Sequence, residues 1–258
     1  MADTSNGLTL RIAGATDVGR VRDHNEDSFA IAERHRLFLV ADGMGGHDLG
    51  EVASKIAVDA IVGYYDRTAA QAAASTAEAG QALAAASRRL VAGIQVANQV
   101  IFELSRRQRR TMGTTIVAAQ LAERTMCIAH VGDSRAYLVR DGSIARLTRD
   151  HSALEDYIQA SPDLTPEDIR AFPYRNVILR ALGTMANVEV DTATLLVEPG
   201  DRVLLCCDGL SNMVNDEAMA AIVSGAPDVE KAAAELVAAA NEAGADDNVT
   251  AVLAECAL

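Results

Sequence analysis

Acidic residues stand at the ends of several short apolar runs, where their type and spacing could support metal chemistry. The runs LFLVADG, CIAHVGD and LLCCDG and the turn GADDN carry Asp42, Asp133, Asp208, Asp246 and Asp247. A further acidic cluster, NED, precedes another run. Carboxylates that converge from strand ends would repel one another unless cations neutralised them. Oxygen ligands without His or Cys favour the hard ions Mg²⁺ or Mn²⁺.

Glycines beside these carboxylates strengthen the metal hypothesis. Gly43 and Gly209 directly follow candidate ligands, and Gly132 precedes one. Glycine permits a sharp turn and lets a backbone carbonyl approach an ion. Taken singly, an Asp-Gly pair after a strand usually marks a turn, and Arg22 alone would be a surface charge. It is the joint pattern that indicates a metal site.

The apolar runs predict the elements that must position these residues. Their length, β-branched content and bounding Gly or Asp residues predict strands in three regions, 8–43, 114–140 and 188–255. The Asp141-Gly142 pair predicts a hairpin turn. Helical periodicity predicts helices at Glu51 to about Tyr65, from about 76 to 107 with a weak point at Gly93, at 215–223 with an Asn N-cap, and at 229–243. Hairpin-like strands with grouped helices indicate an α+β fold.

The bulk composition limits the class of protein. The chain has 258 residues, no composition break and a formal net charge of −13. We expect a single domain over 1–258, with a flap inserted at about 150–181, where three prolines interrupt short helical patches. The negative charge disfavours nucleic acid and anionic lipid as partners. The N-terminus lacks a signal peptide, no run is long enough to span a membrane, and the four cysteines fit buried thiols of a reduced compartment, so we expect a cytoplasmic protein.

Eight motifs in the chain resemble those of the protein phosphatase 2C family, the metal-dependent Ser/Thr phosphatases. They are DVGRVRDHNEDS, VADGMGGHDLGEVAS, MGTT, HVGDSRAYLVRDG, LTRDHS, RALG, GDRVLLCCDGLSN and DDNVT. They occur in the family's order and cover nearly the whole chain, most closely in the compact bacterial form. The resemblance implies two mainly antiparallel β-sheets packed as a sandwich and flanked by helices, in α-β-β-α layers. It also implies phosphorylated protein substrates and a cognate Ser/Thr kinase that acts on the same proteins.

The resemblance also implies a role for each matching residue. Two Mn²⁺ or Mg²⁺ ions, with a weaker third, would hold the water that attacks phosphoserine or phosphothreonine directly. Arg22 would bind the phosphate. The implied metal-site residues are Asp42 bridging both ions, the Gly43 carbonyl, Asp208, Asp247, Asp133 on the third ion, and Glu26 with Asp27 in the outer shell.

Two departures from the family pattern leave alternatives open. Met44 stands where animal members carry a histidine as proposed general acid; His47, three residues on, is a candidate proton donor, and metal-bound water is the other. Asp247 is preferred to Asp246 as ligand because it directly precedes Asn248. The leading hypothesis is an active phosphatase. The alternatives are a non-catalytic phosphoprotein-binding regulatory module on the same fold, and an interaction protein stabilised by Ca²⁺.

Overall fold

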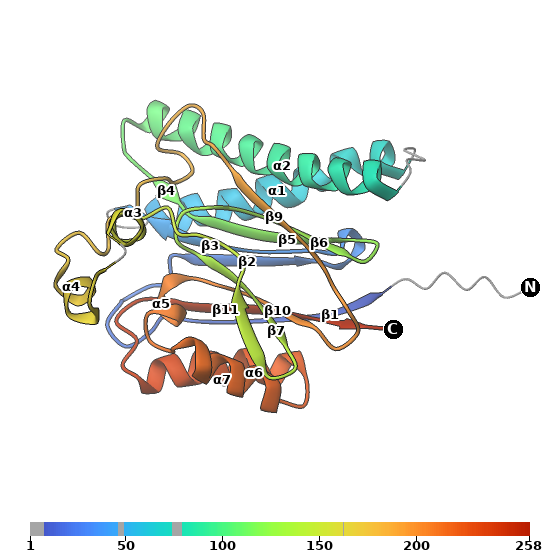
Figure 1. Ribbon diagram of the computed structural model, residues 1–258. Coiled ribbons are helices and arrows are strands. Elements are labelled where there is room, and N and C mark those ends of the chain that lie inside the picture. The colour runs from blue at the N-terminus through green and yellow to red at the C-terminus, as the bar shows by residue number, and fades with distance from the viewer. Residues whose placement is uncertain (1–7, 46–48, 74–78, 162) are drawn as a thin grey trace, which may run out of the picture.

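Two antiparallel sheets stacked face to face form the centre of the molecule (Figure 1). The computed structural model describes residues 8–45, 49–73, 79–161 and 163–258. The first sheet has the order β1 (Thr9–Asp17), β11 (Val249–Ala257), β10 (Arg202–Cys206), β7 (Arg135–Arg140) and β8 (Ser143–Arg146). The second has the order β2 (Asp27–Ala32), β3 (Leu37–Met44), β5 (Ile116–Ala122), β6 (Thr125–Val131) and β9 (Asp191–Leu196), with β4 (Gly113–Thr114) on the end of β3.

The central strands are apolar on both faces because both faces are covered. In β3, Phe38 and Val40 point into the layer between the sheets, whereas Leu37 and Leu39 face the helices. Successive side chains of a strand alternate between faces, so a continuous apolar run is what a strand buried on both sides requires. The run LFLV therefore encodes a central strand that carries Asp42 near its end.

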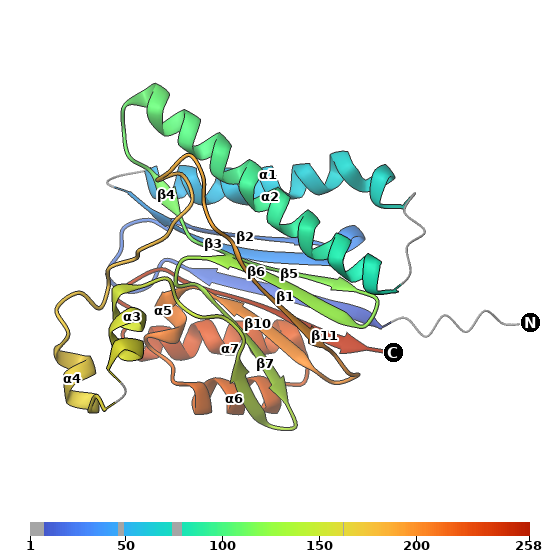
Figure 2. The same cartoon turned by 45° about the horizontal axis from the view of Figure 1, so that its top comes forward.

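Helices cover the outer face of each sheet (Figure 2). Helices α1 (Leu49–Ala73) and α2 (Ala79–Gln108) pack on the second sheet. Helices α6 (Asp216–Gly225) and α7 (Val229–Glu242) pack against the first sheet, and the short α5 (Asp208–Ser211) begins directly at Asp208. These are the α-β-β-α layers and the α+β class expected from the sequence, and both predictions are confirmed.

Local sequence signals explain several element boundaries. The Asn215 side chain accepts a hydrogen bond from the Ala218 amide, which confirms the predicted N-cap of α6. Asp141 and Gly142 both have positive φ, of 51° and 75°, which suits a tight hairpin between β7 and β8. Gly93 does not break α2, since it lies where α2 crosses closely over the Tyr64 ring of α1.

The segment between β8 and β9 lies at one end of the sandwich and carries α3 (Ala153–Ala160) and α4 (Pro166–Ala171) (Figure 1). Its two ends are joined by an isolated bridge between Ser152 and Ile178. Ser152 also caps α3 by accepting a hydrogen bond from the Glu155 amide. The two ends of the segment are therefore held next to each other, as expected of a flap over 150–181. That this flap is a subdomain of a single-domain protein stays a prediction. Within the described residues, no helix has the length and apolar character needed to cross a membrane.

Candidate metal centre

A cleft of about 600 Å³ opens at the flap end of the sandwich. It lies where β3, β6 and β10 end and β11 begins, so residues far apart in sequence meet there. The sequence-predicted site residues that line it are Arg22, Glu26, Asp42, Gly43, Asp133, Asp208 and Asp247. Asp246 and Met44 line it too, and Arg175 and Asn176 of the flap stand on one side. His47 lies outside the described residues.

The pairing of β2 with β3 sets the centre of the cluster. Asp27 and Asp42 are direct partners in this antiparallel register, so their side chains leave the sheet side by side. Oxygens of both carboxylates and the Cys207 sulfur lie within 4.8 Å of one another. The backbone of Asp42 is held by Thr115, whose Oγ1 accepts from the Asp42 amide at 3.0 Å and whose amide donates to the Asp42 carbonyl at 2.8 Å.

Burial and mutual repulsion make these carboxylates costly to ionise. Burial raises the pKa of Asp42 well above its usual value, and the neighbouring Asp27 and Asp208 raise it further. Burial also raises the pKa of Asp27 and that of Asp133 to about 7, and it raises the pKa of Asp208. Only a nearby positive charge makes such a group of anions favourable at neutral pH.

Unpaired buried oxygens show where that charge would lie. Oδ1 of Asp27 and Oδ1 of Asp133 are buried and have no hydrogen-bond partner among the described residues. A buried carboxylate oxygen without a donor is costly, so these two oxygens are suited to bind a cation. The donors are oxygens, and divalent Mg²⁺ or Mn²⁺ prefers oxygen. The residues present therefore fit a hard divalent cation.

Two glycines allow the loops to close around the carboxylates. A Cβ on Gly43 would overlap the backbone of Gly50 and the Glu26 carbonyl oxygen, so the start of α1 can approach the end of β3 only if residue 43 is glycine. A Cβ on Gly209 would overlap the Asn248 carbonyl oxygen in the same way. These close approaches explain why glycine follows both Asp42 and Asp208.

Sequence reasoning did not assign a role to Asn248, which organises the loop before β2. The Asn248 amide nitrogen donates to the carbonyls of Val18 and His24 at 2.9 and 3.0 Å, and its Oδ1 accepts from the Glu26 amide at 2.8 Å. One side chain thus ties the loop that carries Arg22 and Glu26 to the start of β11. The signal was present in the motif DDNVT, whose Asn precedes an otherwise apolar strand.

A chain of hydrogen bonds behind Asp27 also escaped sequence analysis. Thr250 Oγ1 donates to Asp27 Oδ2 at 2.6 Å, and it lies 2.7 Å from Thr16 Oγ1. The Asn25 amide nitrogen donates to Thr16 at 2.8 Å. The Thr250 hydroxyl uses its proton in the bond to Asp27, and the Thr16 oxygen already accepts a hydrogen bond from Asn25. The Thr16 hydroxyl therefore donates its own proton to Thr250. The hydroxyls of Thr16 and Thr250 thus direct their hydrogen bonds toward the Asp27 carboxylate from the opposite sheet, and Asn25 supports them from the loop before β2.

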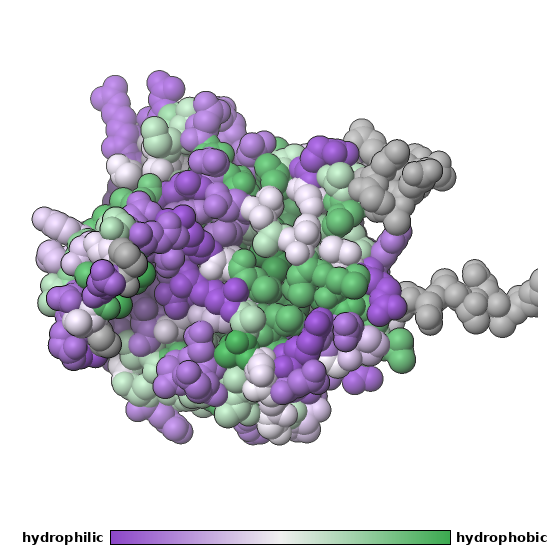
Figure 3. Space-filling view, in the orientation of Figure 1, coloured by the Kyte–Doolittle hydropathy of each residue, from purple (hydrophilic) through white to green (hydrophobic). Residues whose placement is uncertain are grey.

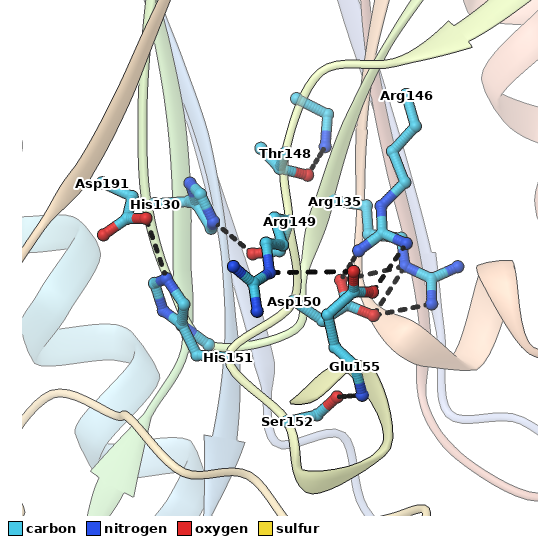
Figure 4. Close-up of polar contacts among 12 residues, drawn as sticks. His130, Arg135, Arg146, Thr148, Arg149, Asp150, His151, Ser152, Glu155 and Asp191 are labelled. Carbon is cyan, nitrogen blue, oxygen red and sulfur yellow. Dashed lines mark hydrogen bonds and ion pairs between the residues drawn. The ribbon is translucent and has the colours of Figure 1, made fainter. Parts of the chain in front are cut away.

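Ion pairs of Arg135 and Arg146 with Asp150 stabilise the wall of the cleft beneath the flap (Figure 4). The buried Asp150 carboxylate accepts from Arg135 at 2.7 Å and pairs with Arg146 at 2.5 Å. His130 and His151 stack with ring centroids 4.7 Å apart at the flap root, and burial lowers the pKa of both. His130 is thus a packed core histidine, whose Nε2 lies 2.7 Å from the Arg149 carbonyl oxygen.

Arg22 lies across the cleft rim beside Asp247. Its guanidinium is 2.7 Å from Asp247 Oδ2, and about half of the side chain is exposed. Asp247 Oδ1 accepts from the Asn248 amide at 2.8 Å. The arginine thus faces the cluster from solvent, within reach of an anion that enters the cleft, and it neutralises one carboxylate of the rim.

Fold and cleft together define a metal-dependent enzyme of the two-sheet sandwich class. Residues 19–254 match the family model described as Protein phosphatase 2C. The chain is 37% identical over 245 residues to a serine/threonine phosphatase of Listeria innocua, covering 93% of each. It is also 37% identical over 250 residues to the phosphatase PstP of Mycobacterium tuberculosis, covering 96% of this chain and 45% of that protein. The chain therefore belongs to the protein phosphatase 2C family.

Solved structures agree with this assignment. The Mycobacterium tuberculosis phosphatase PstP superposes with a TM-score of 0.83 at 35% identity, covering 97% of this chain and all of that one. A structure of the PstP catalytic domain with two manganese ions superposes with a TM-score of 0.81 at 34% identity, covering 97% of this chain and 100% of the other. The predicted family membership is confirmed.

Proposed function

We propose that this chain is a protein serine/threonine phosphatase that depends on Mn²⁺ or Mg²⁺. The observation that carries the proposal is the buried aspartate cluster in the cleft, with the unpaired oxygens of Asp27 and Asp133. Family membership and the resemblance to serine/threonine phosphatases support the substrate class. Phosphorylated proteins are the proposed substrates, a Ser/Thr kinase is the proposed opposing partner, and the cytoplasm is the proposed location.

Different carboxylates of the cluster would bind different ions. Asp42 would be shared by two ions, with the Gly43 carbonyl and the Asp208 and Asp247 carboxylates completing their ligands. Asp133 would hold a weaker third ion, and Glu26 and Asp27 would act through water. When bound, the ions would supply a nucleophilic water of lowered pKa and neutralise phosphoryl charge.

The protein's own groups account for binding and orientation. Arg22 would present two N–H donors to two phosphoryl oxygens, a match that its planar guanidinium allows. Thr115, Asn248 and Thr250 keep the carboxylates and their loops in one arrangement, so little reorganisation is needed during reaction.

The thiol beside the cluster is not suited to form a phospho-enzyme. Cys207 is the nearest thiol, but its sulfur is buried, accepts from the Thr250 amide at 3.1 Å and lies 3.4 Å from the Asn248 carbonyl. Burial and the adjacent Asp27 and Asp42 carboxylates raise its pKa well above its usual value. A protonated, buried thiol is a poor nucleophile. We therefore propose direct hydrolysis by water.

The deciding experiment is hydrolysis of a phosphothreonine peptide by the purified chain. We expect turnover with Mn²⁺ or Mg²⁺, none in excess chelator, and no phosphorylated enzyme in acid-quenched samples. Full turnover in chelator, with metal content measured as nil, would contradict the proposal. Peptide binding without turnover at saturating metal would favour the alternative of a non-catalytic phosphoprotein-binding module, and cation-dependent melting with neither would favour a structural Ca²⁺ site.

A further inference from the structure

The cationic residues of this acidic chain are unevenly distributed. The chain has 23 Lys and Arg residues against 36 Asp and Glu. Four arginines nevertheless fall within five consecutive positions at the C-terminal end of α2, and all four are exposed. We name them the arginine cluster: Arg106, Arg107, Arg109 and Arg110. Such a local excess of one sign, on a surface dominated by the other, creates a strong local potential.

Stabilisation of α2 explains the presence of only two of these four arginines. Arg106 and Arg107 lie in the last turn of α2, where cations interact favourably with the helix dipole. Arg106 also packs over the Phe102 ring, and Arg107 pairs with Glu103 at 3.4 Å. Arg109 lies beyond the helix end at Gln108. Arg110 lies beyond that end as well.

The backbone beyond the helix is held firmly although its side chains are exposed. The Arg110 amide donates to the Ser105 carbonyl at 3.2 Å, and Ser105 Oγ donates to the Arg110 carbonyl at 2.6 Å. The Arg109 amide donates to the Arg106 carbonyl at 3.3 Å. Within the described ranges, no carboxylate forms an ion pair with Arg109 or Arg110. The two guanidinium groups are thus presented to solvent from a fixed turn.

This turn lies beside the mouth of the cleft. Gly113, three residues after Arg110, pairs in β4 with Met44, and Met44 and Gly45 line the cleft. The Thr111 carbonyl lies against Gly45. Figures 1 and 2 show the end of α2 on the same side of the molecule as the flap, and Figure 3 shows hydrophilic side chains projecting there. Three residues of chain span at most about 10 Å, and two paired strands lie about 5 Å apart, so these lengths limit how far the turn can lie from the residues that line the cleft.

We propose that the arginine cluster docks an acidic segment of the phosphoprotein substrate, a role that rests on the proposed phosphatase function. An extended peptide advances about 3.3–3.6 Å per residue, so acidic residues roughly four to seven positions from the phosphorylated residue would reach the cluster. Each exposed ion pair contributes only about 1.5- to 5-fold, so several together select acidic substrates by about tenfold. The position of the cluster beside the mouth of the cleft favours a segment of the substrate, rather than nucleic acid or an anionic membrane, as the occupant.

The test compares phosphothreonine peptides whose distal positions, on either side of the phosphothreonine, are acidic or neutral. The cluster variant is R109E/R110E, and the matched control is R34E/R124E, which reverses two arginines at the opposite end of the second sheet. For the wild type and the control at low salt, we expect kcat/KM to be about tenfold higher on the peptide that is acidic on one side of the phosphothreonine than on the neutral peptide. The cluster variant should lose this preference. Hydrolysis of a small aryl phosphate should stay unchanged in all three.

The possible results separate the explanations. No acidic preference in the wild type, or an unchanged preference in R109E/R110E, would overturn the docking role, as would an equal loss in R34E/R124E, which would show bulk electrostatics. Cluster-dependent binding to duplex DNA or to phosphatidylserine vesicles at physiological salt, without peptide preference, would also overturn it. Absence of any hydrolysis, even of the aryl phosphate, would instead contradict the proposed phosphatase function itself.

Discussion

The buried Asp27 carboxylate makes the metal-free protein less stable as the pH rises. Its pKa in the folded protein is raised from 3.8 to about 7, chiefly by burial. Between these two values the folded protein keeps a proton that the unfolded chain has released. This stabilisation is complete below about pH 4 and is lost as the pH rises through 7. At about 1.4 kcal/mol per pH unit, the wild type loses about 2–3 kcal/mol from this group between pH 5 and 7.

Asp27→Asn removes this titration and keeps an acceptor for Thr250. In chelator, we expect the stability of the variant relative to wild type to improve by about 2–3 kcal/mol between pH 5 and pH 8. For a chain of this size that corresponds to roughly 5–10 °C in melting temperature. The measurement is thermal unfolding by circular dichroism at both pH values. Asp133 titrates in the same range, so the variant retains part of the pH dependence.

The control is Asp59→Asn, which changes an exposed aspartate on α1 with a carboxylate 3.4 Å from Lys55. It should melt with the same pH dependence as wild type. Saturating Mn²⁺ should abolish the advantage of Asp27→Asn at pH 8, because a bound cation favours the ionised carboxylate. If the relative stability of Asp27→Asn were the same at pH 5 and pH 8, the argument from burial and repulsion would be wrong.

Substitutions at four further residues test single contacts. Asp42→Ala should remove turnover at saturating substrate and metal in steady-state assays; near-normal kcat would exclude a shared ligand. Arg22→Ala should lower kcat/KM by about ten- to a hundredfold, the value of a charged hydrogen bond, while calorimetry shows unchanged metal stoichiometry; collapse of metal binding would show that its contact with Asp247 is structural. Asp133→Ala should keep two tightly bound ions yet turn over far more slowly, and unchanged turnover with an unchanged melting temperature would rule out any role. Thr250→Val should weaken Mn²⁺ binding by about tenfold in calorimetry, and Thr250→Ser should restore it; equal affinity in all three proteins would show that the hydrogen-bond chain is dispensable.

Local chemistry determined much of the fold before any tertiary contact is considered. The run LFLV must be buried on both faces, Asp141-Gly142 favours a tight hairpin, and Asn215 caps the helix that follows it. Each signal acts through neighbours in the sequence or through the alternation of side chains along a strand. The aspartates at strand ends likewise indicated a site for hard cations, because no other arrangement makes converging carboxylates favourable.

Tertiary structure alone decided which groups meet. The register of β2 on β3 sets Asp27 opposite Asp42, and a shift of β2 by one residue would turn the Asp27 side chain to the other face of the sheet. The bond from Thr250 to Asp27 and the tie from Asn248 to the loop before β2 join residues more than two hundred positions apart. The end of α2 reaches the mouth of the cleft only because β4 pairs with β3. Periodicity reports the face on which a residue lies, but the partner across the sandwich depends on register, twist and loop closure over the whole chain.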